Sequence, residues 1–162
     1  MDPRTHSFEW KSPTPDLAGR SGLAFLEGMA RGEIPQAPFH SALGMRLLEA
    51  THGHVKVGAT PAPYHCNLLG TIHGGFTSTL LDSALGCAVL STLDADTTFA
   101  TLELHVHMVR ALTLQTGPLV TEAHVVHRGR QVATSEGRIL DAAGKLYAHA
   151  TCTCLLSPRR GA

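Results

Sequence analysis

The sequence Asn67-Leu-Leu-Gly-Thr-Ile-His73-Gly74-Gly75-Phe-Thr-Ser-Thr-Leu-Leu-Asp82 leads into a segment of helical length that carries one charged side chain. Between Gly74 and Leu93 that charge is Asp82, and its neighbours are apolar or small polar residues. An unpaired carboxylate in a protein core costs several kcal/mol unless it is solvated or used in chemistry. We therefore expect a long buried helix in which Asp82 is functional. The Ser, Thr and Gly content makes this segment too polar for a membrane span.

The second half of the chain changes to a hydrophobic period of two, which is typical of strands. Four strands are predicted, and they cover Phe99–Arg110, Leu119–His127, Gln131–Leu140 and Lys145–Leu156. A tight turn at Arg128-Gly129 separates the second from the third. Because the last three strands follow one another through short turns, we expect them to pair antiparallel.

Two of these strands have predicted faces. In the first strand, one set of side chains is expected in the core: Leu102, Leu104, Val106 and Met108. The opposite set faces water or a partner: Thr101, Glu103, His105 and His107. In the last strand, small side chains share one face: Ala148, Ala150, Cys152 and Cys154. Small side chains let another element approach closely, so we expect the long helix to lie on them.

The first half of the chain predicts one short helix and one hairpin. Ser21–Ala30 has apolar residues at helical spacing, and Ala42–Glu49 and His54–Ala59 flank a turn. Residues 1–20 contain three prolines and are expected to form a loosely held N-terminal arm. With 162 residues and 43% apolar content, the chain is long enough for one domain, which we place at residues 21–158.

The charge balance and the cysteines restrict location and partners. Thirteen basic and thirteen acidic residues give a formal net charge of zero, so no global field favours nucleic acid or an anionic membrane. The four cysteines contain no C-x-x-C pair, and the first residues lack the basic and apolar run of a secretory signal. We therefore predict a cytoplasmic protein with reduced thiols.

Four local motifs stand out between residues 21 and 156. They are Leu43-Gly44-Met45-Arg46-Leu47, Asn67-x-x-Gly70-Thr-x-His73-Gly74-Gly75, Asp82-Ser83-Ala84 and His127-Arg128-Gly129-Arg130. Together they resemble the hotdog-fold acyl-CoA thioesterases of the phenylacetate-degradation type. The resemblance implies an α+β hotdog fold, in which a curved antiparallel β-sheet wraps around a long central α-helix. It also implies hydrolysis of an acyl-CoA thioester to a free acid and coenzyme A. One departure is Ala111-Leu112, where many relatives have a proline.

The resemblance also implies roles for single residues. Asp82 would be the catalytic carboxylate, and Gly74 would be the backbone donor to the thioester oxygen. Asn67 would lie near the attacking water or the thioester, and His73 would help to shape the oxyanion site. Purely structural roles are the alternatives: Asn67 could form a turn, and His73 could stabilise the start of the helix by bonding to the backbone.

The motif meets the chemical requirements of thioester hydrolysis, which needs a nucleophile and hydrogen-bond donors aimed at the developing oxyanion. Gly74 and Gly75 at a helix start leave backbone N–H groups free and let a substrate approach closely. The helix dipole adds favourable potential for the oxyanion. Asp82 can act as a general base on water or attack directly to give an anhydride, and the sequence leaves both open.

The spacing of Gly74 and Asp82 predicts a site shared between subunits. Eight residues of helix separate them by about 12 Å along the axis. A donor and a nucleophile must each come within about 3 Å of the reacting group, so one thioester cannot reach both in one chain. We expect a homo-oligomer, a dimer or a tetramer, in which antiparallel subunits each contribute one of the two residues.

The phosphates of coenzyme A need local cations in a neutral protein. Arg128 and Arg130 flank Gly129 at a predicted turn and are candidates for this contact, with Arg110 a weaker one. Without such a ligand, they would be ordinary solvated charges. No cofactor is expected, because coenzyme A is part of the substrate.

No metal site is expected either. The two histidines at positions 105 and 107 share a strand face, but no third ligand accompanies them. Cys87 is expected in the core rather than as a nucleophile, because no partner base accompanies it.

Two other functions stay open. A non-catalytic acyl-CoA or acyl-carrier binding protein of the same fold would keep Arg128 and Arg130 but would not need Asp82. An enoyl-CoA hydratase of the same fold would need an Asp/His pair in another arrangement, which the sequence does not contain. Aryl and medium-chain acyl groups both remain candidates for the substrate.

Overall fold

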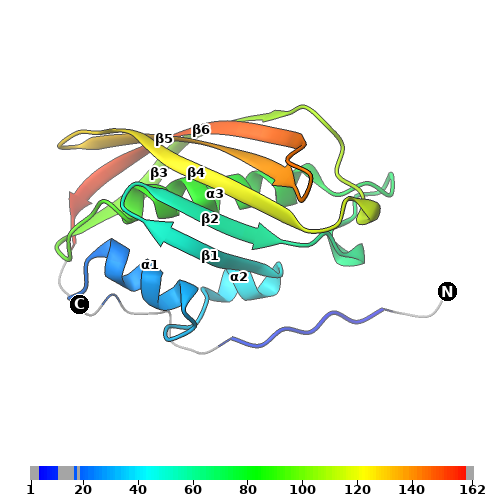
Figure 1. Cartoon of the computed structure of the whole chain (residues 1–162), viewed down its shortest axis with the longest axis horizontal. Helices are drawn as coiled ribbons and strands as arrows, with labels where there is room; N and C mark the ends of the chain where they lie inside the picture. The colour runs from blue at the N-terminus through cyan, green and yellow to red at the C-terminus, as the bar shows by residue number, and fades with distance from the viewer. Residues whose placement is uncertain (1–3, 11–16, 18, 160–162) are drawn as a thin grey trace.

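A six-stranded antiparallel sheet curves around one long helix (Figure 1). This computed structural model describes residues 4–10, 17 and 19–159. The helices are α1 (Gly22–Ala30), α2 (Pro38–Ala42) and α3 (Gly74–Leu90), with 3₁₀ turns at Pro63–His65 and Leu114–Thr116. The strands are β1 (Met45–Thr51), β2 (His54–Ala59), β3 (Thr97–Met108), β4 (Leu119–Arg128), β5 (Val132–Asp141) and β6 (Leu146–Pro158). The hotdog architecture predicted from the motifs is therefore confirmed.

The core lies between α3 and the concave face of the sheet. Leu80, Leu81 and Leu85 of α3 are completely buried there. The four small side chains of β6 are buried opposite the helix, as predicted, with exposures of 2% or less: Ala148, Ala150, Cys152 and Cys154. Because no bulky side chain stands on this part of β6, the helix can approach the sheet closely and exclude water from the middle of the domain.

Strand order differs from the order along the chain. The sheet runs β1-β2-β4-β5-β6-β3, so β3 lies at an edge beside β6 and not next to β4. The three later strands pair consecutively, as predicted. The short helix α2 was not predicted, because five residues are too few to show a helical period. It starts with Pro38 at its first position, where a missing N–H costs nothing.

A β-bulge in β3 changes which side chains face the helix. Thr101 pairs with Cys154 and Glu103 with Thr153, so Leu102 is an additional residue. The inward and outward alternation reverses at this point. Thr101 therefore faces α3, and Leu102 is 61% exposed. The predicted faces of these two residues were wrong, because strict alternation cannot anticipate an inserted residue. Met108 was also expected in the core, and it is 51% exposed at the end of this edge strand.

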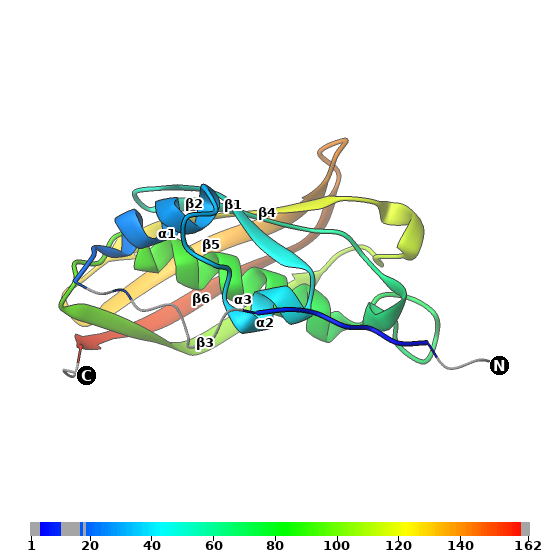
Figure 2. The same cartoon turned by 90° about the horizontal axis from the view of Figure 1, so that it is seen from below.

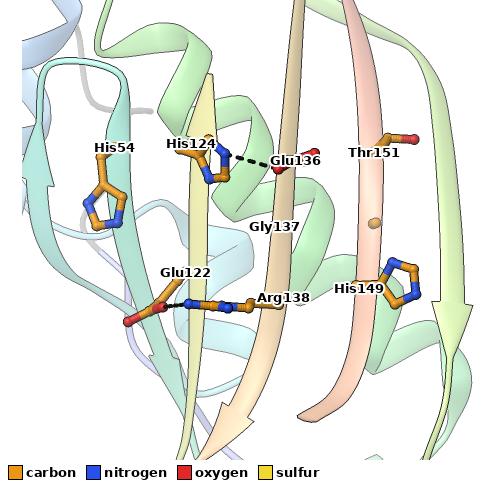
Figure 3. Close-up of a pocket in the computed structure, with 9 residues that line it drawn as sticks. His54, Glu122, His124, Glu136, Gly137, Arg138, His149 and Thr151 are labelled. Carbon is orange, nitrogen blue, oxygen red and sulfur yellow. Dashed lines mark hydrogen bonds and ion pairs between the residues drawn. The ribbon is translucent and has the colours of Figure 1, made fainter. Parts of the chain in front are cut away.

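The convex face of the sheet is polar. A shallow hollow of about 350 Å³ is lined there by side chains from β2, β4, β5 and β6 (Figure 3). Two polar contacts cross it: His124 lies 3.1 Å from the Glu136 carboxylate, and Arg138 forms an ion pair with Glu122 at 3.3 Å. Among the residues that the structure describes, no group of three or more His, Cys, Asp or Glu side chains could hold a metal ion.

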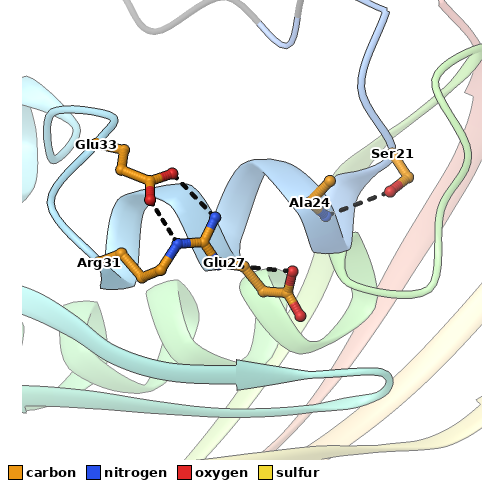
Figure 4. Close-up of polar contacts among 5 residues, drawn as sticks. All are labelled: Ser21, Ala24, Glu27, Arg31 and Glu33. Carbon is orange, nitrogen blue, oxygen red and sulfur yellow. Dashed lines mark hydrogen bonds and ion pairs between the residues drawn. The ribbon is translucent and has the colours of Figure 1, made fainter.

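Helix α1 is fixed at both ends (Figure 4). The Ser21 hydroxyl accepts a hydrogen bond from the Ala24 N–H at 3.3 Å and so caps the helix. At the other end, Arg31 forms ion pairs with Glu27 at 3.9 Å and Glu33 at 2.8 Å. Helix α1 covers the segment that its apolar spacing predicted. It packs beside β1.

Residues 4–10 are extended and run past α2 (Figure 2). His6 anchors this stretch, with its Nε2 3.0 Å from the Ala42 carbonyl oxygen. The division into an arm at 1–20 and a domain at 21–158 stays a prediction, since part of the first segment lies outside the described residues. None of the helices in the described ranges is long and apolar enough to cross a membrane.

Candidate active site

The start of α3 is organised by His73, which is the N-cap residue. Its Nδ1 accepts a hydrogen bond from the Gly75 N–H at 2.8 Å, so the ring proton of a neutral imidazole sits on Nε2. A Cβ on residue 75 would come within 2.9 Å of this Nδ1, which explains the second glycine of the motif. The Gly75 N–H is thus occupied within the chain. The predicted roles of His73 and Gly75 at the substrate stay predictions.

The N–H group of Gly74 is not bound by the His73 cap, which takes the N–H group of Gly75. As the first residue of α3 it has no helical acceptor, and no hydrogen bond in the described part of the chain uses its N–H. Gly74 lines a hollow of about 330 Å³ together with Asn67, Met108 and Arg110. A Cβ here would meet only the flexible end of Met108, at 3.0 Å. A free helix-terminal N–H on a residue that lines a hollow is suited to a developing negative charge.

Asn67 shapes the loop that precedes the helix. Its Oδ1 accepts from the Leu69 N–H at 2.8 Å and the Thr71 N–H at 3.3 Å, and its Nδ2 donates to the Thr71 hydroxyl at 2.8 Å. Asn67 also borders the hollow at Gly74. Its amide is thus engaged by the loop in this structure, and its predicted contact with water or thioester stays a prediction.

Asp82 lies two turns further along α3 and is half-buried. Its Oδ1 accepts a hydrogen bond of 3.1 Å from the Thr101 hydroxyl, and its Oδ2 has no hydrogen-bond partner among the described residues. Asp82 lines a second hollow, of about 420 Å³, with Phe39 from α2 and Leu102 and Leu104 from β3. No described Lys, Arg or His side chain pairs with this carboxylate. An uncompensated carboxylate beside apolar walls is suited to accept a proton or attack a carbonyl carbon.

The sequence did not select two residues that border Asp82. Strict alternation places Thr101 on the outer face of its strand, because the bulge that turns it inward has no sequence signature. Phe39 was missed because it stands on the unpredicted helix α2. Cys87, by contrast, behaves as expected: burial and then the charge of Asp82 raise the pKa of its thiol to about 12. It therefore stays protonated at neutral pH.

The predicted phosphate contacts lie at the β4–β5 turn. The Gly129 N–H donates to the Val132 carbonyl oxygen at 2.8 Å, and Arg128 donates to the Gly129 carbonyl oxygen at 2.9 Å. Arg130 is exposed. The turn lies near Asp94, whose pKa is lowered first by a hydrogen bond from Thr97 and also by the charge of Arg128.

Asp94 follows the C-terminal end of α3, so the arginine turn and Gly74 stand at opposite ends of this helix. Arg110 stands at the Gly74 end. It donates to the Leu146 carbonyl oxygen, and its guanidinium lies 5.6 Å from the centre of the Tyr147 ring. One chain therefore offers cations at both ends of the long helix.

Known proteins resemble this chain across most of the domain. Residues 69–148 match the model of the Thioesterase superfamily. A protein of Halobacterium salinarum, provisionally described as an esterase, is 34% identical over 104 residues; these cover 59% of this chain and 65% of that protein, just under two thirds. Human acyl-coenzyme A thioesterase 13 is 31% identical over 112 residues, covering 68% of this chain and 79% of that protein. A phenylacetic acid degradation-related protein of Ralstonia eutropha JMP134 superposes with a TM-score of 0.72 at 28% identity, covering 80% of this chain and 98% of that one.

Proposed function

This chain belongs to the thioesterase superfamily and is a thioester hydrolase, and we propose that it hydrolyses aryl or medium-chain acyl-CoA thioesters to a free acid and coenzyme A. The name of the human relative supports coenzyme A as the thiol part. The observation that carries the proposal is the pairing of a free helix-terminal N–H at Gly74 with an unneutralised carboxylate at Asp82, each beside an open hollow. We assign the oxyanion contact to the first and the base or nucleophile to the second.

Two subunits are needed to complete one site. Gly74 and Asp82 lie on one helix about 12 Å apart and border different hollows. Both hollows also border β3, which is an edge strand with no neighbour on its outer side. An antiparallel partner across this edge, with the two-fold axis near Leu104 and His105, would bring Thr101 opposite the partner subunit's Met108. Asp82 would then face the partner's Gly74.

Exposed apolar side chains near both hollows support this antiparallel pairing of two subunits. On the Gly74 side, the exposed residues are Leu68, Leu69, Met108 and Val109, and on the Asp82 side they are Phe39 and Leu102. Each of these side chains is at least half exposed. Exposed apolar side chains gathered near two hollows favour a contact with another molecule. A homodimer is the smallest assembly that covers them and completes the site.

The chemistry divides between the two subunits. The Gly74 N–H of one subunit hydrogen-bonds the thioester oxygen and stabilises the negative charge that it gains. Asp82 of the other takes a proton from a water molecule that attacks the carbonyl carbon. The C–S bond then breaks, the acid leaves, and the coenzyme A sulfur receives the proton. Direct attack by Asp82 would instead break the C–S bond, release the coenzyme A thiolate and form an anhydride, which water then opens to free the acid and restore Asp82. Thr101 holds Oδ1 and leaves Oδ2 for the reaction.

The acyl group is assigned to the hollow at Asp82. Phe39 and Leu102 give it an apolar wall that is 59% and 61% exposed in the single chain, and Leu104 lies beside them. An aromatic wall favours an aryl group, because ring pairs add stabilisation beyond the buried area. The phosphates of coenzyme A are assigned to Arg128 and Arg130, which antiparallel pairing moves toward the partner's Gly74.

Complementation between two inactive variants tests the shared site. Gly74→Pro removes the N–H donor and adds a ring without disturbing the backbone: Pro suits the first helical position, and His73 already has the extended conformation that precedes proline, with φ −63° and ψ 136°. Gly74→Ala keeps the N–H and controls for the added Cβ. We expect Gly74→Pro to lower kcat by about 10²- to 10³-fold. Asp82→Asn should lower it by about 10²- to 10⁴-fold.

A heterodimer of Gly74→Pro and Asp82→Asn chains, purified through two different tags, contains one intact site. It should show about half of the wild-type activity if the site is shared, since each subunit then supplies what the other lacks. A heterodimer as inactive as both parents would overturn the shared site. Wild-type protein that binds coenzyme A esters without releasing thiol from aryl or alkyl thioesters would instead identify a binding protein.

A further inference from the structure

Four aromatic rings form a continuous stack from residues 4–10 to the first turn of α3. We call His6, Tyr64, His65 and Phe76 the aromatic stack. The ring centres of His6 and Tyr64 are 3.6 Å apart, those of Tyr64 and His65 are 4.2 Å apart, and those of His65 and Phe76 are 3.9 Å apart. The first and last of these pairs are stacked nearly parallel, at 18° and 23°, and the middle pair, Tyr64 and His65, meets edge to face at 65°. Only Phe76 belongs to the region that matches the thioesterase superfamily.

The stack meets the helix start at two points. Phe76 is the third residue of α3 and is 5% exposed, so its ring fixes the first helical turn. The His65 carbonyl oxygen accepts the His73 N–H at 2.8 Å and so holds the N-cap residue directly. His73 in turn engages the Gly75 N–H. A displacement of His65 is therefore passed to both residues that flank the Gly74 N–H.

His65 is unusual for a side chain with 4% exposure. Its Nδ1 accepts from the Ala62 N–H at 3.1 Å, while its Nε2 is buried without a geometric hydrogen-bond partner in the described chain. Burial lowers the pKa of this imidazole. A contact with the Leu43 carbonyl oxygen partly offsets that lowering, and the charge of His6 adds to it. A buried Nε2 without a well-aligned hydrogen-bond partner lowers the stability of the fold, so the side chain at this position calls for an explanation. The ring stacks on Phe76 and meets Tyr64 edge to face, so it links these two side chains.

The outer end of the stack contributes little to the core. His6 is exposed and Tyr64 is 45% exposed, and His6 is held by its ring contact with Tyr64 and by the Ala42 carbonyl. Removal of either ring therefore leaves the packing between α3 and the sheet intact. What it removes is the lateral support of His65.

We propose that Tyr64 and His65 are positioning residues for the Gly74 N–H, and that docking of His6 completes the stack that holds them. The inference rests on the proposed role of Gly74 in thioester hydrolysis. The stack does not touch the hollow at Asp82, so its loosening acts on the oxyanion contact and not on acyl binding. The rate of the chemical step should change while substrate affinity does not.

The test uses point variants in the full chain. His6→Ala and Tyr64→Ala remove a ring, while His6→Phe and Tyr64→Phe keep one. We expect the alanine variants to lower kcat by about five-fold with KM within about two-fold, since an aromatic pair is worth on the order of 1 kcal/mol. The phenylalanine variants should stay within about two-fold of wild type in both constants. Equal kcat in all four variants, or equal losses in the alanine and phenylalanine variants, would overturn the proposal.

A second measurement separates this inference from the proposed function. The Gly75 and Phe76 amides donate to His73, so their hydrogen exchange reports the order of the helix start without any reaction. We expect faster exchange at both amides in His6→Ala than in His6→Phe, while core amides of β6 are unchanged. Unchanged exchange at Gly75 and Phe76 would refute the coupling. Full activity in Gly74→Pro would refute the role of Gly74 and leave the exchange result standing.

Discussion

The Thr101 hydroxyl donates a hydrogen bond of 3.1 Å to Oδ1 of Asp82 and so ties the edge strand β3 to helix α3. The bond depends on the bulge at Leu102, which turns Thr101 inward. This donor holds one carboxylate oxygen and leaves the other unpaired among the described residues, on a side chain that lines the hollow we assign to the acyl group.

Thr101→Val should therefore lower kcat by about ten-fold, which is the value of one well-placed hydrogen bond to a charged group. Thr101→Ser keeps the hydroxyl and should stay within about three-fold of wild type. Steady-state kinetics with one aryl-CoA thioester checks both variants. Equal rates for the valine and serine variants would show that this hydrogen bond does not orient Asp82.

His73 should prove to be chiefly a helix cap. His73→Ala removes the acceptor for the Gly75 N–H and should cost about 1 kcal/mol of unfolding free energy. His73→Asn supplies another capping oxygen and should recover most of that stability. Urea unfolding checks the stabilities, and thiol release checks the rates. If His73→Asn restores stability but leaves the rate more than about a hundred-fold low, His73 has a direct role in the reaction.

Phe39 should set the preference for the acyl group. Phe39→Ala removes an aromatic wall of the hollow at Asp82 and should lower kcat/KM for an arylacyl-CoA by about ten-fold. Acetyl-CoA is too small to reach that wall, so its kcat/KM should change by less than about two-fold. Phe39→Leu is the matched control that keeps an apolar side chain. An equal loss with both substrates would place Phe39 in the framework instead of the acyl pocket.

Arg128 and Arg130 should act on the phosphates of the substrate. The double change to Gln should raise KM for a coenzyme A thioester by about ten-fold and reduce its dependence on salt. The N-acetylcysteamine thioester of the same acid lacks phosphates and provides the control, because its KM should not change. If both thioesters respond alike, the β4–β5 turn has no phosphate contact.

Cys87 should be dispensable for the reaction. Burial and the nearby charge of Asp82 raise the pKa of its thiol to about 12, so only about one molecule in ten thousand carries a thiolate at pH 8. Cys87→Ala should retain kcat/KM within about three-fold of wild type. A loss of more than about a hundred-fold in a folded variant would make Cys87 a candidate nucleophile.

Local patterns carried most of the fold prediction. Helix α3, its cap and the strands after it depend on spacings within a few residues, and they lie where the sequence places them. The same locality applies to Gly75, since a Cβ there would come within 2.9 Å of the Nδ1 of His73 two residues before it. The site residues Thr101 and Phe39 were harder to find. One depends on a bulge and the other on a five-residue helix, and neither leaves a periodic signal.

The sequence by itself determined the type of domain and most of its secondary structure, and it placed Gly74 and Asp82 on one long helix. The distance between Gly74 and Asp82 follows from helix geometry alone. Only the tertiary structure decided that β3 stands at an open edge, that Thr101 and Phe39 border Asp82, and that the aromatic stack reaches the helix start. These features depend on contacts between residues far apart in the chain. Local propensity does not encode such contacts, because they form only when the sheet closes around the helix.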